Sequence, residues 1–131
     1  MGLTSEERQA IVCYRIENAR KALAEAKAIA GMGYWNIVAS RLYYCLYYVS
    51  TALLIRNQYS VHTHAGMLTL MNQHFVQTGQ LSKDEGRLLK KMYTLRQEGD
   101  YEDFVEVTED EIRMYIPLTE SLMQKIINLI G

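Results

Sequence analysis

The sequence predicts an all-α protein: an up-and-down antiparallel bundle of four core helices, followed by a C-terminal helix kinked near Pro117. Only one proline and eight glycines occur among 131 residues, and strand-rich folds need many turns built from these residues. Apolar side chains recur at the three- and four-residue spacing of helices, and three capping boxes mark helix starts. The length is that of one domain, so residues 1–131 are expected to fold as a single unit.

Two helices are predicted in the first half of the chain. The first begins after Thr4, which forms a capping box with Glu7, and ends at Gly31 and Gly33. Its apolar stripe consists of Val12, Ile16, Ala19, Leu23, Ala26 and Ala30. The second helix covers about residues 34–56 and is apolar almost all round, which is typical of a central helix.

Three further helices are expected in the second half of the chain. One begins near His62 or Thr63 and ends at Gly79. The next starts with the capping box of residues 82–85, and the last covers about residues 108–130. Pro117 should kink or divide this last helix, because it lacks an amide and crowds the preceding turn. The longest irregular stretch is expected at residues 99–107.

Composition excludes several classes of protein. The formal net charge of −1 argues against an overtly basic nucleic-acid coat, and two cysteines are too few for a disulfide scaffold. No apolar run reaches the length of a membrane span, and the first residues lack the pattern of a signal peptide, so a cytoplasmic protein without membrane contact is expected. Glycine-rich phosphate loops and metal-ligand spacings do not occur, so neither a metal nor a cofactor is expected.

The small net charge conceals two segments of opposite sign. Residues 8–96 carry 12 basic and four acidic side chains, whereas residues 97–131 carry two basic and nine acidic ones. Nucleic acid could approach the basic helices, while the acidic segment would repel phosphate, dock on the bundle or engage a basic partner. The alternative is that most of the acidic segment is simply solvated.

Three polar residues occupy positions where the helical pattern expects apolar ones. Arg41 lies among apolar neighbours on the second helix, and Arg96 shares a side of its helix with Leu89 and Met92. His64 is in register with the apolar residues Leu68, Met71 and Phe75 on the third helix. Each has a structural alternative to a functional role: an ion pair for Arg41, capping of a helix end for Arg96, and a satisfied core position for His64.

Tyrosine is unusually frequent, with ten residues against two phenylalanines. Four of them crowd the second helix, at Tyr43, Tyr44, Tyr47 and Tyr48. A buried tyrosine hydroxyl needs a hydrogen-bond partner. Tyrosines of the core or of a dimer interface fit this pattern better than base-stacking platforms, which usually lie in basic grooves.

Three stretches taken together resemble a known family. They are residues 34–44, with the sequence YWNIVASRLYY, residues 61–79, which contain VHTHAG and FVQTG, and residues 95–104, LRQEGDYEDF. In this order they resemble the HEPN domain, and specifically its small stand-alone prokaryotic members. The resemblance covers most of the chain.

The resemblance implies a helical bundle that forms a homodimer and acts in a toxin–antitoxin or stress and defence module beside a minimal nucleotidyltransferase. Many family members are metal-independent ribonucleases whose signature is an arginine followed, after four to six residues, by histidine. Arg96 matches that arginine, but no histidine follows it, and Tyr101 stands where a general base is expected. Tyrosine titrates near pH 10 and is a poor base at neutral pH. Tyr101 also matches tyrosines that partner transferases adenylylate in some family members.

The leading hypothesis is therefore a HEPN-like protein that binds RNA, a nucleotide or a nucleotidyltransferase. Arg41, Tyr44, Arg96 and Asp100 are the candidate ligand-binding residues. One alternative is a ribonuclease using Arg96, Tyr101 and His64, with the imidazole of His64 supplied from another helix. The other alternative is a helical adaptor without enzymatic activity.

Overall fold

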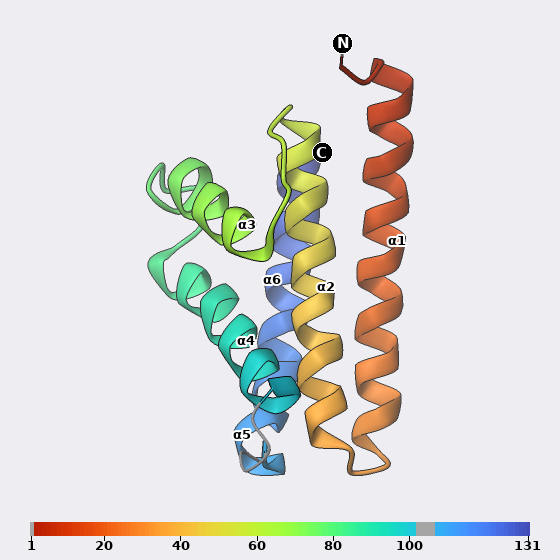
Figure 1. Cartoon of the computed structure of the whole chain (residues 1–131), viewed down its shortest axis with the longest axis vertical. Helices are drawn as coiled ribbons and strands as arrows, with labels where there is room; N and C mark the ends of the chain where they lie inside the picture. Colours follow the sequence, from red (N-terminus) through yellow and green to blue (C-terminus); the bar gives the residue numbers. More distant parts are fainter. Residues whose placement is uncertain (1, 102–106) are drawn as a thin grey trace.

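The computed structural model describes residues 2–101 and 107–131, with side chains described up to Gln97 and again from Val107. The described part is helical and contains no strand. Its elements are α1 (Ser5–Ala30), α2 (Trp35–Arg56), α3 (His64–Met71), the π-helical segment η1 (Asn72–Val76), α4 (Lys83–Tyr101), α5 (Glu109–Arg113) and α6 (Tyr115–Ile130). The long helices alternate in direction along the chain, as an up-and-down bundle requires (Figure 1). The predicted all-α bundle is confirmed.

The predicted helix starts coincide with observed caps. The hydroxyl of Thr4 accepts a hydrogen bond from the Glu7 amide, while the Glu7 carboxylate accepts one from the Thr4 amide at 2.9 Å. Ser82 and Glu85 form the same reciprocal pair ahead of α4. Thr108 accepts from the Glu111 amide at the start of α5. Each cap satisfies amides that have no partner inside the helix.

The end of α4 differs from the sequence prediction, and the division of the last helix makes that prediction more specific. Helix α4 continues through Gly99 to Tyr101, although an irregular stretch was expected from Gly99, because a glycine inside a helix costs only about 1 kcal/mol and does not by itself end it. The last helix is divided at Met114, between α5 and α6. Pro117 explains the division, since its ring would crowd the carbonyl of Arg113 in a continuous helix.

Helix α2 is the centre of the molecule. It packs against α1 on one side and against α3 and α4 on the other, with α6 alongside (Figure 1). Of the described helices only α2 is long and apolar enough to cross a membrane, and 67% of that apolar stretch is buried by the other helices. Its apolar composition is therefore accounted for by its central place in the bundle.

Candidate functional site

Polar aromatic side chains from three helices meet on the side of α2 that faces away from α1. Tyr43, Tyr44 and Tyr47 come from α2 and His64 from the first turn of α3. Neighbouring ring centroids lie 4.6–6.3 Å apart, the shortest separation being that between Tyr47 and His64. We call this group the Tyr–His–Arg cluster; its members are Tyr43, Tyr44, Tyr47, His64, Tyr93 and Arg96.

The hydroxyl of Tyr43 is the buried anchor of the cluster. Tyr43 is 0% exposed, and its Oη lies 2.5 Å from Nδ1 of His64. Burial, reinforced by the neighbouring tyrosines, raises the pKa of Tyr43 far above its ordinary value. The hydroxyl is therefore protonated at neutral pH and able to donate to the imidazole.

The imidazole of His64 is held in its neutral form. Burial lowers the pKa of His64, and the nearby positive charge of Arg96 lowers it further. Its position in the first turn of α3 acts in the same direction, because the amino end of a helix disfavours positive charge. When the Tyr43 hydroxyl donates to Nδ1, the ring hydrogen lies on Nε2, which can then donate to a bound group.

Arg96 faces inward from α4, as the sequence predicted. Its Nη2 donates to the hydroxyl of Tyr44 at 3.0 Å, and its guanidinium lies over the Tyr44 ring, 5.3 Å from the centroid. The same guanidinium lies 6.0 Å from the Tyr43 centroid. Arg96 and His64 are both half-buried, so each keeps part of its surface in contact with solvent. These contacts hold the guanidinium on an aromatic surface beside the imidazole.

Arg41 lies at the edge of this group. Its guanidinium lies over the Tyr44 ring at 5.2 Å, and its Nη1 lies 3.5 Å from a carboxylate oxygen of Glu25 on α1. The ring of Tyr44 therefore contacts two guanidinium groups. The structural alternative considered for Arg41, an ion pair that ties α2 to an acidic residue, is observed here alongside its contact with Tyr44.

The structure thus brings together His64, Arg96, Tyr44 and Arg41 among the residues singled out from the sequence. The side chains of Asp100 and Tyr101, the two other candidates, lie outside the described residues. The sequence pointed to the tyrosines of α2 as a group, but it did not identify Tyr93. The available signal was its position one helical turn before Arg96, on the same side of α4.

The described side chains of the cluster determine what it can bind. They supply a cation, a neutral imidazole, phenolic hydroxyls and aromatic rings, and no carboxylate. A guanidinium and an N–H group side by side are suited to the oxygens of a phosphate or carboxylate. Aromatic rings beside them are suited to the face of a nucleobase.

Comparisons with known proteins found a matching family profile and several similar proteins. A sequence profile described as "HEPN domain" matches residues 12–129. A Thermotoga maritima protein named "UPF0332 protein" is 32% identical over 124 residues, which cover 95% of this chain and 94% of the relative. Two Methanocaldococcus jannaschii proteins are also similar. "Putative toxin MJ0605" is 30% identical over 92% of this chain and 87% of its own length. "Putative toxin MJ0142" is 27% identical over 73% and 65%.

Proposed function

The chain belongs to the HEPN family, and on that premise we propose that it acts as the toxin of a toxin–antitoxin pair by binding RNA at the Tyr–His–Arg cluster. Two of its relatives carry the printed name "Putative toxin". The observation that carries the RNA part of the proposal is the meeting of Arg96 and His64, from α4 and α3, on one tyrosine surface.

Phosphate is the ligand group that Arg96 and His64, the polar half of the cluster, fit best. A guanidinium can donate two parallel hydrogen bonds to phosphate oxygens, and its charge attracts the backbone of nucleic acid. His64 adds an N–H donor without adding a second charge, because its pKa is lowered by burial and by Arg96. The aromatic half gives half-buried rings at Tyr44, Tyr47 and Tyr93 on which an unpaired base can stack.

The test measures binding of the purified full chain to a fluorescent single-stranded RNA at several salt concentrations. Replacing Arg96 by Ala should weaken binding by about ten- to a hundredfold, because a hydrogen-bonded charged contact is lost. Arg20→Ala is the matched control, since it removes an exposed arginine from α1, away from the cluster. Equal affinity of the two variants, or the absence of binding by the unmodified chain, would contradict the proposal.

RNA cleavage is a second candidate function, supported by the position of His64. The residues after Arg96 contain no histidine, but the cluster includes an imidazole from α3. To act as a base, His64 must take the proton of a ribose 2′-hydroxyl on Nε2 while its Nδ1–H donates to Tyr43. The 2′-oxygen then bonds to phosphorus, and the 5′-oxygen leaves with a proton from solvent. The products are a 2′,3′-cyclic phosphate and a 5′-hydroxyl end.

Cleavage is tested by incubating the chain with end-labelled RNA in the presence of a metal chelator. Products with cyclic phosphate ends that disappear in both Arg96→Ala and His64→Ala would support this second function. RNA that binds but stays intact would leave the chain as a binding protein only. Cleavage that survives both substitutions at full rate would place the activity elsewhere or in a contaminant.

The partners are also part of the proposal. The family resemblance supports a cytoplasmic homodimer and a minimal nucleotidyltransferase antitoxin that adenylylates Tyr101. Co-expression with the neighbouring gene product followed by intact-mass measurement should give a shift of one or more adenylyl groups, which Tyr101→Phe abolishes. Light scattering of the purified chain gives the oligomeric state. An unmodified chain that is monomeric and copurifies with no partner would contradict this part.

A further inference from the structure

A groove with a mixed lining of polar and apolar residues lies between the α3–η1 segment and α4, the same helices that supply His64, Tyr93 and Arg96 to the Tyr–His–Arg cluster. It consists of two adjoining hollows of about 640 Å³ and 430 Å³. They share the lining residues Asn72, Gln77 and Lys90, so they form one continuous depression, which we call the α3–α4 groove. One end is lined by Ala65, the residue that follows His64, and the other by Lys83 at the start of α4.

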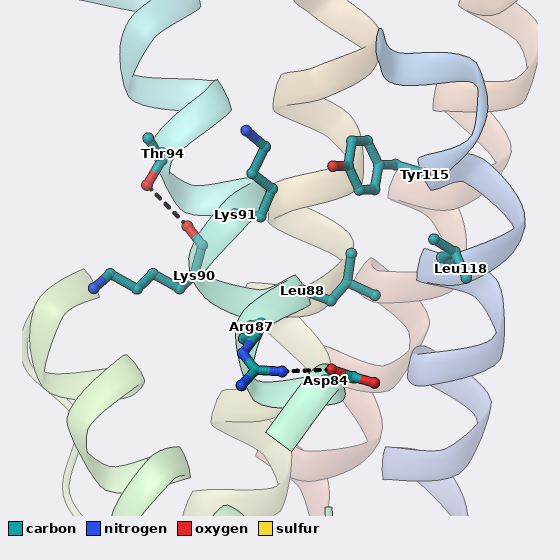
Figure 2. A pocket seen from close by; sticks show the side chains of 8 residues that line it. All are labelled: Asp84, Arg87, Leu88, Lys90, Lys91, Thr94, Tyr115 and Leu118. Carbon is teal, nitrogen blue, oxygen red and sulfur yellow. Dashed lines mark hydrogen bonds and ion pairs between the residues drawn. The ribbon is translucent and has the colours of Figure 1, made fainter. Parts of the chain in front are cut away.

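The α4 wall of this groove is positively charged. Lys83, Arg87 and Lys90 line it from positions spaced four and three residues apart, which places them on one face of the helix. Figure 2 shows Lys90 extending toward the α3 side of α4, whereas Leu88 faces Tyr115 and Leu118 of α6. Of the described residues that line the groove, none is acidic. Asp84 pairs with Arg87 from outside the groove, but both side chains are largely exposed, and such surface pairs are weak.

The opposite wall carries side-chain amides, and the π-helical turn of η1 aligns them. The amide N–H of Gln77 bonds to the carbonyl of Asn72 at 2.8 Å, five residues back. This wider turn places Gln77 directly beyond Asn72, on the same side of the helix as the groove. Gln73 lines the same wall. Amide side chains both donate and accept hydrogen bonds, which lets them pair with the edges of nucleobases.

The floor of the groove depends on a glycine. A Cβ atom at Gly86 would lie only 3.0 Å from Cγ2 of Val76. The glycine therefore lets α4 approach η1 closely, at the cost of about 1 kcal/mol of helix stability. The close approach keeps the cationic wall and the amide wall near each other, so one bound chain can touch both.

We propose that the α3–α4 groove binds single-stranded RNA that extends from the Tyr–His–Arg cluster. The phosphates would lie along Lys83, Arg87 and Lys90, and the bases would face Asn72, Gln73 and Gln77. A single strand is the fitting occupant, because its base edges are free to pair with side chains, whereas those of a duplex are engaged with each other. The inference rests on the proposed RNA-binding function and specifies the substrate class and its path.

The test uses the full chain and two double variants that each remove two positive charges. Lys83→Ala with Lys90→Ala alters the groove, and Arg20→Ala with Lys21→Ala alters an exposed part of α1. The groove variant should weaken single-stranded RNA binding by at least tenfold and reduce the slope of log affinity against log salt by about 1.4, since each lost phosphate contact on a single strand contributes about 0.7. The α1 variant should change neither quantity. Circular dichroism verifies that both variants remain helical.

Two further readouts separate an RNA path from general attraction of polyanions. Gln77→Ala should change the ranking of affinities among poly(A), poly(U) and poly(C) while leaving the salt slope unchanged. Photocrosslinking with 4-thiouridine RNA should label peptides of residues 65–77.

The outcomes distinguish this inference from the proposed function. If Arg96→Ala abolishes RNA binding while the two double variants bind RNA equally well, the groove proposal is contradicted and the proposed function still holds. A chain that binds no RNA, or that binds only an acidic protein partner, would overturn both proposals.

Discussion

The two sides of α2 contact side chains of different chemical character. Toward α1 it meets a stripe of small apolar residues, in which Ala19, Ala22 and Ala26 are at most 2% exposed. Toward α3 and α4 it presents the tyrosines that contact His64 and Arg96. This alanine stripe contributes packing alone, because methyl groups offer no hydrogen-bonding or ionisable group. The polar contacts between α1 and α2 are separate from it: Arg15 donates to Thr51, and Arg41 pairs with Glu25. The second side holds two polar groups with shifted pKa values, the buried Tyr43 and the half-buried His64, and shifted pKa values are a common property of functional sites.

The largest expected effect comes from the apolar side. Leu23 on α1 is 5% exposed, and Leu23→Ala should lower the free energy of unfolding by about 2–5 kcal/mol, because it removes buried methyl groups and leaves a cavity. Urea denaturation followed by circular dichroism measures the change. RNA affinity of the folded variant should equal that of the unmodified chain. A loss of less than 1 kcal/mol, or a weakened RNA affinity, would contradict the division of roles between the two sides.

The matched change on the polar side is Tyr44→Phe. It removes the hydroxyl that accepts a hydrogen bond from Arg96 while keeping the ring. The free energy of unfolding should fall by about 1.5–3 kcal/mol, as expected for one hydrogen bond to a charged group. Because the guanidinium then loses a contact that fixes its orientation, RNA binding should also weaken. Unchanged stability together with unchanged RNA binding would show that this contact has no role.

The pH dependence of stability tests the environment of His64. Its pKa is lower in the folded chain than in the unfolded chain, so the unfolded chain binds the proton first as the pH falls. The stability contributed by neutral His64 is therefore complete above its ordinary pKa near 6.5, and it is lost as the pH falls through the folded pKa.

Arg96→Ala should raise the pKa of His64 part of the way toward its ordinary value. The positive charge of Arg96 is then gone, while burial, the larger cause, remains. An NMR titration of the ring proton measures this pKa, with the resonance assigned from His64→Gln. A pKa that does not move in Arg96→Ala would mean that the two groups are not coupled.

The smallest expected effect is at the ion pair between Arg41 and Glu25. The pair is 3.5 Å long, and its side chains are 30% and 42% exposed. Glu25→Gln should change the free energy of unfolding by less than about 1 kcal/mol, because partly exposed pairs are weak. Arg41 stays over the Tyr44 ring in this variant, so RNA binding should be unchanged or slightly stronger. A loss of several kcal/mol would show that the pair is a main support of the α1–α2 hairpin.

Much of the fold could be predicted because its signals are local. The capping residues at Thr4, Ser82 and Thr108 act on amides within three residues, so sequence spacing alone reveals them. Pro117 divides the last helix through contacts with its own preceding turn. The π-helical turn at residues 72–76 was not predicted, because no distinctive residue marks it in the sequence; in the structure, Val76 at its end packs closely against Gly86 of α4.

The candidate site was only partly accessible to sequence reasoning. Arg96, Arg41 and His64 were noticed because polar residues on an apolar helix face contradict the helical pattern. Their assembly could not be derived from that pattern, since Tyr44 and Arg96 are separated by 52 residues along the chain. The lowered pKa of His64 likewise depends on burial and on a charge that another helix supplies.

By itself, then, the sequence determined the helices, their caps, the apolar faces that bring them together and the family resemblance. These features depend on interactions between residues that are close in the sequence, and for such residues the sequence spacing directly sets the distance in space. Only the tertiary structure decided that His64 and Arg96 share one tyrosine surface and that the amides of η1 face the lysines of α4. The physical reason is that helix packing sets which side chains from distant segments meet, and the resulting burial sets their charge.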